Sequence, residues 1–124
     1  MTRKQALTDL LAKVEAGEFD ATEDRPAKFN GFCSHWEAAR GAYTNPNYKT
    51  AWLAYNGSLD AAKALHEAVL PGWGYAVSPQ YARVVDPIPL YGSPNKSKDA
   101  INADNPARAW LIALLKALIA ECDA

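Results

Sequence analysis

The 124-residue chain has little of what usually assigns a protein to the membrane or to secretion. No uninterrupted apolar run approaches the roughly 20 residues that a membrane-spanning helix needs. The N-terminus begins with basic residues, but the apolar stretch of a signal peptide does not follow. We therefore expect no contact with a membrane and a location in the cytoplasm.

An excess of one charge is also missing. The sequence has 13 lysines and arginines against 14 aspartates and glutamates, which gives a net charge of −1. Proteins that bind nucleic acid generally carry a basic excess, so this balance argues against general nucleic-acid binding. A local basic patch remains compatible with it.

Cysteine is scarce, and motifs of familiar catalytic and metal sites are missing. Cys33 and Cys122 can form one disulfide at most, and we expect both to be reduced thiols. With His35 and His66 they would supply four zinc ligands, but the sequence has neither C-x-x-C nor H-x-x-x-H. A Cys33–His35 nucleophile pair lacks an identifiable orienting partner. Glycine-rich phosphate loops and G-x-S-x-G are absent too, so we expect no metal or cofactor and favour a protein that is not an enzyme.

The clearest pattern that is present is a C-terminal helix. Asn105 is a suitable N-cap, and Pro106 occupies the first helical position, where its missing N–H costs nothing. Apolar residues then recur at helical spacing. This face, which we expect at the centre of the core, consists of Trp110, Leu111, Leu114, Leu115, Leu118 and Ile119.

Two further helices have recognisable ends. Thr2 and Gln5 form a capping box before a helix that stops at Gly17. Ser58 is the N-cap of a helix that ends at Pro71-Gly72.

The chain between these helices is harder to interpret. Residues 18–28 are polar and contain Pro26, so we expect a loop. A helix from about Gly31 to Arg40 follows, although the aromatic residues there also favour a strand. Lys49 to Tyr55 is expected as a short strand or extended segment.

A hairpin follows the helix that ends at Pro71-Gly72. Residues 73–78 alternate in the manner of a strand, and residues 81–85 can return beside them. Pro87 and Pro89 stop the second strand and suggest that it lies at or near a sheet edge. Residues 90–104 are expected as a long polar connection. The whole predicts one α+β domain over residues 1–124, with an antiparallel sheet of two to four strands packed against three or four helices.

The start of the C-terminal helix is the best candidate for a ligand site. Free backbone N–H groups, an arginine and two upstream lysines there would suit a phosphate or carboxylate, and nearby tyrosines could stack on a base. Alternatively, Asp99 and Asp104 neutralise the lysines and the loop is merely solvated. The candidate ligand-binding residues are Arg108, Lys96, Lys98, Arg83, Tyr91 and Tyr81.

Aromatic residues suggest a second kind of surface. Most of the four tryptophans should be buried in a domain of this size. Any that is exposed would mark a protein interface, where tryptophan and tyrosine are enriched. The candidates are Trp73, Tyr75 and Trp52.

Several stretches of the chain resemble stretches of a group of small phage and prophage proteins. They are Ser-Leu-Asp-Ala-Ala from Ser58, the Gly-Trp strand near Trp73, the opening Asn-Pro-Ala-Arg-Ala-Trp of the last helix, and the leading helix around residues 10–16. The resemblance implies an origin in phage and a location in an infected bacterial host. It offers no catalytic residue to transfer. Small accessory proteins of phages often counter host defence by sequestering a nucleotide signal or by binding a host protein.

The sequence thus predicts a phage-type accessory protein that acts by binding, with a nucleotide-like anion as its ligand. One alternative is an inhibitor or oligomeric interaction module that binds a host or phage protein. The other is a small hydrolase whose site assembles only in the folded chain. Homo-oligomers are compatible with the apolar content.

Overall fold

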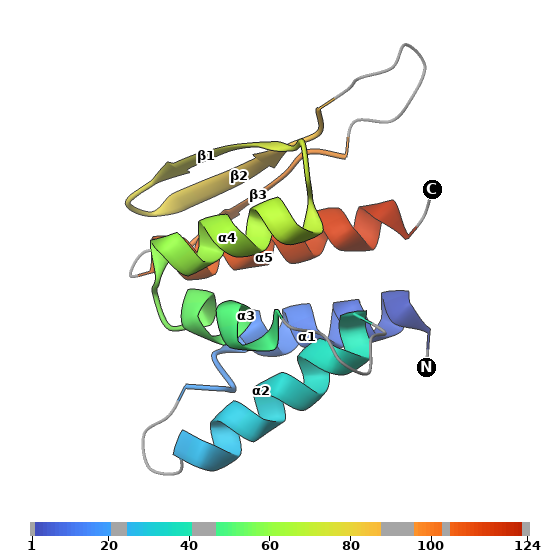
Figure 1. Ribbon diagram of the computed structural model, residues 1–124, viewed down its shortest axis with the longest axis vertical. Coiled ribbons are helices and arrows are strands. Elements are labelled where there is room, and N and C mark those ends of the chain that lie inside the picture. Colours follow the sequence, from blue (N-terminus) through green and yellow to red (C-terminus); the bar gives the residue numbers. More distant parts are fainter. Residues whose placement is uncertain (1, 21–24, 41–46, 88–95, 103–104, 123–124) are drawn as a thin grey trace.

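The computed structural model describes residues 2–20, 25–40, 47–87, 96–102 and 105–122. These residues form an α+β domain of five helices and a three-stranded antiparallel sheet, which confirms the predicted fold class (Figure 1). The elements are α1 (Arg3–Ala16), α2 (Arg25–Arg40), α3 (Tyr48–Tyr55), α4 (Leu59–Val69), β1 (Gly74–Ser78), β2 (Tyr81–Val85), β3 (Lys98–Ile101) and α5 (Pro106–Glu121).

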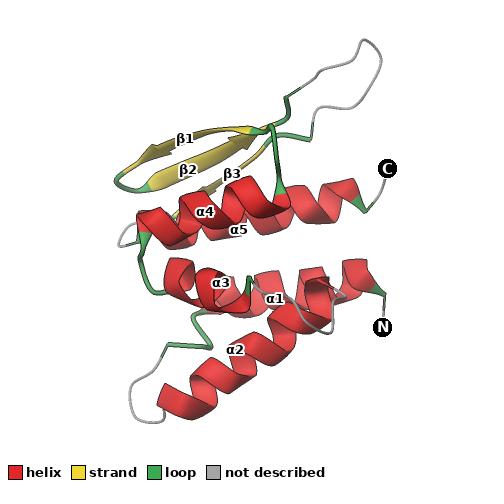
Figure 2. Ribbon diagram, in the orientation of Figure 1, coloured by secondary structure: helices red, strands yellow, loops and turns green. Residues whose placement is uncertain are grey.

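The sheet lies at one end of the elongated molecule, and the described helices cover only one of its faces (Figure 2). Helices α4 and α5 run beneath it, and α1, α2 and α3 lie on the far side of that pair (Figure 1). Helix α5 packs against α1, α3, α4 and every strand of the sheet, and ten of its residues are buried. The expectation that this helix forms the centre of the core is confirmed.

The predicted helix ends are also confirmed. The Thr2 hydroxyl accepts a hydrogen bond from the Gln5 N–H, and the Gln5 side chain accepts one from the Thr2 N–H, so the capping box is complete. Gly17 ends α1 at φ 72°, a left-handed conformation that glycine adopts without strain. Ser58 caps α4 by accepting from the Ala61 N–H at 3.1 Å.

Three predictions between residues 18 and 55 need correction: the loop over residues 18–28, the helix start near Gly31, and the strand or extended segment from Lys49 to Tyr55. Helix α2 begins at Arg25 rather than near Gly31, and Pro26 lies in its first turn, where proline is tolerated. Residues 48–55 form helix α3 and neither a strand nor an extended segment. The buried side chains of Ala51, Ala54 and Tyr55 follow helical spacing, and packing of α3 on α4 and α5 overrides the strand preference of its aromatic residues.

The sheet confirms the hairpin and corrects its surroundings. The strand order is β1-β2-β3, so β2 is the central strand and not an edge strand. Pro87 follows the end of β2 and so takes no place in its hydrogen-bond ladder, while Pro89 lies outside the described residues. The predicted connection over residues 90–104 contains a third strand, β3, whose Ala100 pairs with Ala82. The described residues form five helices, where three or four were expected.

Candidate functional site

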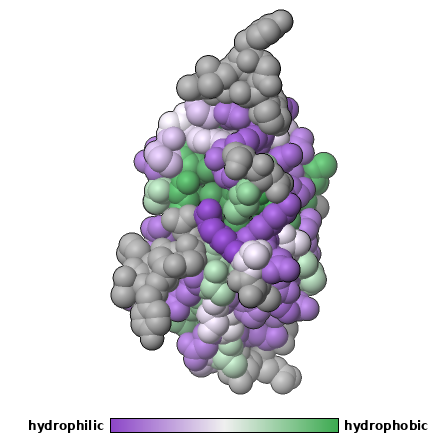
Figure 3. Space-filling model, turned by 90° about the vertical axis from the view of Figure 1, so that its right-hand side faces the viewer, coloured by the Kyte–Doolittle hydropathy of each residue, from purple (hydrophilic) through white to green (hydrophobic). Residues whose placement is uncertain are grey.

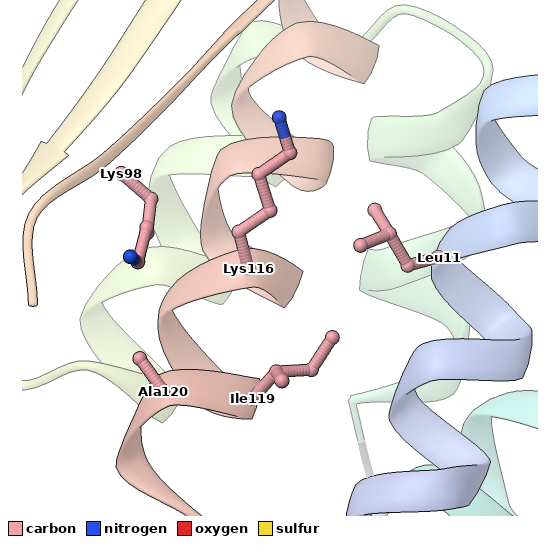
Figure 4. Close-up of a pocket in the computed structure, with 5 residues that line it drawn as sticks. All are labelled: Leu11, Lys98, Lys116, Ile119 and Ala120. Atoms are coloured by element: carbon pink, nitrogen blue, oxygen red, sulfur yellow. The ribbon is translucent and has the colours of Figure 1, made fainter. Parts of the chain in front are cut away.

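A pocket lies beside the C-terminal half of α5, and we call it the lysine pocket. It has a volume of about 300 Å³ and is lined by Leu11, Lys98, Lys116, Ile119 and Ala120. Figure 4 shows Lys98, which extends from β3, beside Lys116 on α5, and Leu11, which points from α1 toward α5. Two lysines and an apolar lining, contributed by three elements, therefore surround the pocket.

Helical spacing and strand register explain how these side chains come together. Lys116, Ile119 and Ala120 lie three and four residues apart, so they share one face of α5. On β3, Lys98 is paired with Val84, whose buried side chain identifies the sheet face that turns toward the helices. Lys98 is half-buried on that face, where the long aliphatic stem of a lysine covers apolar surface.

No carboxylate among the described residues neutralises either lysine of the pocket. Lys116 Nζ donates to the backbone carbonyl of Asp99 at 3.1 Å, and Lys98 Nζ has no ion-pair or hydrogen-bond partner within the described part of the chain. A carbonyl oxygen satisfies a donor but carries no full charge. Both ammonium groups thus keep a net positive charge that an anion could bind.

The surroundings of the pocket are apolar. Leu11 and Ile119 are partly buried and pack against the main core. On the side of the molecule where α5 ends and α1 begins, apolar surface gathers at the height of α4 and α5 and is bordered by hydrophilic surface (Figure 3). A ligand suited to such a place combines an anionic group with an apolar or aromatic part.

Lys96 lies close to this pocket but is already paired. Its Nζ is 3.6 Å from Oε1 of Glu121, the residue after Ala120, and its backbone N–H donates to Asp86 Oδ2 at 3.2 Å. Lys96 and Lys98 are therefore brought to the same end of α5, and Lys98 contributes a charge that has no ion-pair partner among the described residues.

Arg108 is held at the other end of α5. Its Nε donates to the Tyr55 carbonyl at 3.0 Å, one terminal nitrogen is 2.7 Å from Asp20 Oδ1, and the guanidinium lies 3.8 Å from the centre of the Tyr55 ring. Burial of Asp20 acts to raise its pKa, but hydrogen bonds from Arg108 and Tyr55 outweigh it and the pKa of Asp20 lies below its usual value. Burial, followed by the hydrogen bond to Asp20, raises the pKa of Tyr55.

The structure therefore does not bring Arg108 together with Lys96. Arg108 and Glu121, the partner of Lys96, are thirteen residues apart on one continuous helix. At 1.5 Å per residue that separation is about 20 Å, more than a single nucleotide-sized anion spans. Lys96 and Arg108 therefore lie at opposite ends of α5.

Two further predicted ligand-binding residues, Arg83 and Tyr81, belong to neither end of α5. Arg83 lies on β2 between the buried Ala82 and Val84, so its side chain is directed to the opposite face of the sheet, away from the lysine pocket. Tyr81 shares that face and donates from its hydroxyl to Asp99 Oδ2 at 3.4 Å. Tyr91 lies outside the described residues.

Of the three aromatic interface candidates, Tyr75 is the most exposed, and Trp52 and Trp73 are half-buried. Trp52 is partly buried and stacks on Tyr55 with ring centroids 5.7 Å apart. Trp73 is also partly buried against the core. The Tyr75 side chain is 43% exposed, although its ring contacts Trp110 with a centroid distance of 4.6 Å.

His66 lies in the core, and both cysteines are free thiols. His66 is buried, its Nδ1 accepts from Trp110 Nε1 at 3.2 Å, and its Nε2 faces the Trp73 carbonyl at 2.9 Å. Because one nitrogen accepts and the other must donate, these partners specify the neutral Nε2–H tautomer. Cys33 and Cys122 are free thiols, and burial, with a smaller effect of Glu37, raises the pKa of Cys33. Within the residues that the structure describes, no three His, Cys, Asp or Glu side chains gather as a metal site would require.

Sequence reasoning found Lys98 but missed Lys116 and Leu11. Lys116 interrupts the apolar pattern of α5 between Leu115 and Ala117, both buried, and this lysine on an otherwise buried stretch was the available signal. Leu11 could be assigned to a helix from its spacing, but its position opposite Lys98 depends on the packing of α1 against α5.

No protein-family model, curated protein or solved structure matches the chain. None of the helices in the described ranges is both long and apolar enough to cross a bilayer. The residues of the lysine pocket therefore have to be interpreted from their own chemistry.

Proposed function

We propose that the protein acts by binding, and that the lysine pocket holds a nucleotide-like anion. One observation carries this proposal. Lys98 and Lys116, which have no carboxylate partners among the described residues, both line a pocket whose other lining residues are apolar. Lys13 and Arg108, by contrast, have such partners in Glu18 and Asp20. The charge of the pocket is thus available to a ligand.

The shape of the pocket favours an anion that also has a flat or apolar part. A phosphate would lie against the ammonium groups, where charged hydrogen bonds are strongest. A base or other ring would cover Leu11 and Ile119. The volume of about 300 Å³ is at the small end of ligand pockets, which suits a mononucleotide better than a larger cofactor.

The resemblance to small phage proteins supplies a biological setting for this binding. A phage-encoded protein that holds a nucleotide without consuming it would act by sequestration, and it would lower the free concentration of a host defence signal. This setting is part of the proposal and rests on the resemblance alone.

A thermal-shift screen tests the proposal. Purified protein is heated with inorganic phosphate, AMP, ADP or cyclic nucleotides. A ligand present at about 100 times its dissociation constant stabilises the fold by about 2.7 kcal/mol, which raises the midpoint by several degrees. We expect this rise in the wild type and a reduced rise in Lys98→Ala and Lys116→Ala.

Lys63→Ala is the matched control. Lys63 is exposed on α4, and its substitution removes the same charge at a place away from the pocket. Equal stabilisation of wild type, control and both pocket variants would contradict the location of the site. No stabilisation of the wild type by any of these anions would contradict the ligand class.

A further inference from the structure

The sheet has a second face that no described helix covers. Along β2 and β3, Ala82, Val84 and Ala100 are buried against the helices, so the alternate residues form what we call the outer face. It comprises Tyr81, Arg83, Val85, Asp99 and Ile101. The Ile101 side chain is 77% exposed, the largest exposed fraction among the exposed large apolar residues of the described chain.

We propose that the outer face is the interface of a homodimer, in which a second copy of the chain packs face to face on the first. The two-fold axis would run parallel to the strands, between β2 and β3. The proposal rests on the strand register and is independent of the lysine pocket, which lies on the other side of the sheet.

The register makes the outer face complementary to itself. Arg83 is paired with Asp99 across β2 and β3, and Tyr81 is paired with Ile101. A rotation about an axis between these strands places each residue opposite the copy of its own cross-strand neighbour. Arg83 then faces Asp99 of the second copy, and Tyr81 faces Ile101 of the second copy, each contact occurring twice.

The charges of the outer face fit this arrangement. Arg83 is exposed and has no hydrogen-bond or ion-pair partner in the part of the chain that is described. The Asp99 carboxylate is exposed, and within the described ranges it accepts only the Tyr81 hydroxyl, at 3.4 Å. Two reciprocal Arg83–Asp99 ion pairs would lie next to the two apolar contacts between Tyr81 and Ile101. The net charge of −1 per chain adds little repulsion between copies.

The size of the face predicts a reversible dimer. Three strands about 4.8 Å apart and about 17 Å long cover on the order of 250 Å². Even with side chains included, this area falls below the roughly 800 Å² per partner of a stable complex. We therefore expect association that depends on protein concentration and weakens as salt screens the ion pairs.

Sedimentation equilibrium of the full chain tests this proposal, over concentrations from about 10 μM to about 1 mM, where weak dimers form. We expect the mean mass to rise from 13.5 kDa toward twice that value. Ile101→Asp should lower the association constant at least tenfold, because it buries a carboxylate at the contact. Its exposed position leaves the fold intact, which circular dichroism checks.

Charge reversal identifies the axis. Arg83→Asp should also lower association at least tenfold, since it opposes two carboxylates, and the double variant Arg83→Asp/Asp99→Arg should restore it. Leu53→Asp is the matched control: Leu53 is 54% exposed on α3, and its substitution should leave association unchanged. A monomer throughout the concentration range would overturn the proposal. So would a dimer that persists equally in Ile101→Asp and Arg83→Asp, or a double variant that stays monomeric.

Discussion

Among single residues, Arg108 shows how a cation expected to bind a ligand can instead hold the fold together. It joins the start of α5 to the end of α3 through the Tyr55 carbonyl and to Asp20 through an ion pair of 2.7 Å. Only 15% of its side chain is exposed, so these contacts are largely shielded from water. Its structural partners account for most of its donors.

We expect Arg108→Ala to destabilise the protein by about 1–3 kcal/mol, since it removes a hydrogen bond to a carbonyl, an ion pair and a ring contact. Urea unfolding measures the loss. Arg108→Lys keeps the charge without the planar guanidinium, so its stability should lie between those of the wild type and Arg108→Ala. Arg108→Ala should bind phosphate or AMP as the wild type does. A loss of binding at unchanged stability would show that Arg108 belongs to the ligand site.

The Asp20 carboxylate predicts a dependence of stability on pH. Its pKa in the folded state lies below its unfolded value, so the interaction stabilises the fold at pH above the unfolded pKa and is lost as pH falls through the folded pKa. Wild type should therefore be more stable than Asp20→Asn near neutral pH, with the gap closing below about pH 4. The gap should be modest, because half of the Asp20 side chain is exposed. A gap that stays constant down to pH 2.5 or so would exclude this carboxylate as its source.

His66 is a second residue whose role is structural. Its two ring nitrogens connect the Trp110 indole to the Trp73 carbonyl, and so tie α4 to α5 and to the chain before β1. We expect His66→Phe to cost about 2–4 kcal/mol, because it fills the space but leaves a buried donor and a buried acceptor unpaired. His66→Gln, which can both donate and accept, should cost less. Thermal and urea unfolding would give the order, and equal stability of the two variants would contradict the hydrogen-bond explanation.

At the scale of the elements, α5 depends on its N-cap. The Asn105 Oδ1 accepts from the Arg108 N–H at 2.9 Å, while its Nδ2 donates to the Tyr55 carbonyl at 3.2 Å. We predict that Asn105→Ala lowers the free energy of unfolding by about 1 kcal/mol, as is typical for a lost cap. Asn105→Ser keeps a side-chain acceptor for the cap and places no carboxylate oxygen against the Tyr55 carbonyl, so it serves as the control. A neutral effect of the alanine substitution, measured by urea unfolding, would mean that Pro106 and the core alone define the helix start.

The elements that could be predicted from sequence are those with local signals. Helices α1, α4 and α5 have a capping residue and an apolar face, and the hairpin has alternating residues. Helix α3 lacks both a side-chain cap and a long pattern, so only its packing on other helices reveals it. Strand β3 buries only Ala100, and nothing in its four residues indicates a strand without β2 beside it.

The same distinction applies to the candidate site. The sequence could show that Lys96 and Lys98 lie before a cationic helix start, and it placed both near Arg108 by proximity along the chain. In the fold, β3 runs beside α5 and returns Lys98 to Lys116 in the second half of the helix. Proximity in sequence therefore misled because the segment between Lys98 and Asn105 includes a strand.

On the scale of the whole molecule, cations with different roles are distributed around α5. Its beginning carries an arginine that is neutralised by Asp20 and packed on Tyr55. Its later turns carry Lys116, which meets Lys98 in an apolar pocket without a carboxylate partner among the described residues. The proposal of anion binding depends on this difference between the two ends.

An NMR titration of ¹⁵N-labelled protein with AMP, and in parallel with inorganic phosphate, compares the two ends of α5 in one experiment. We predict saturable shifts of the backbone amides of Lys98, Lys116, Ile119 and Ala120 with AMP, and their loss in Lys98→Ala. Phosphate should shift the lysine amides with lower affinity, because it lacks a part that covers Leu11. Shifts confined to the amides around Asn105 and Arg108, or none with either anion, would contradict a binding site in the lysine pocket.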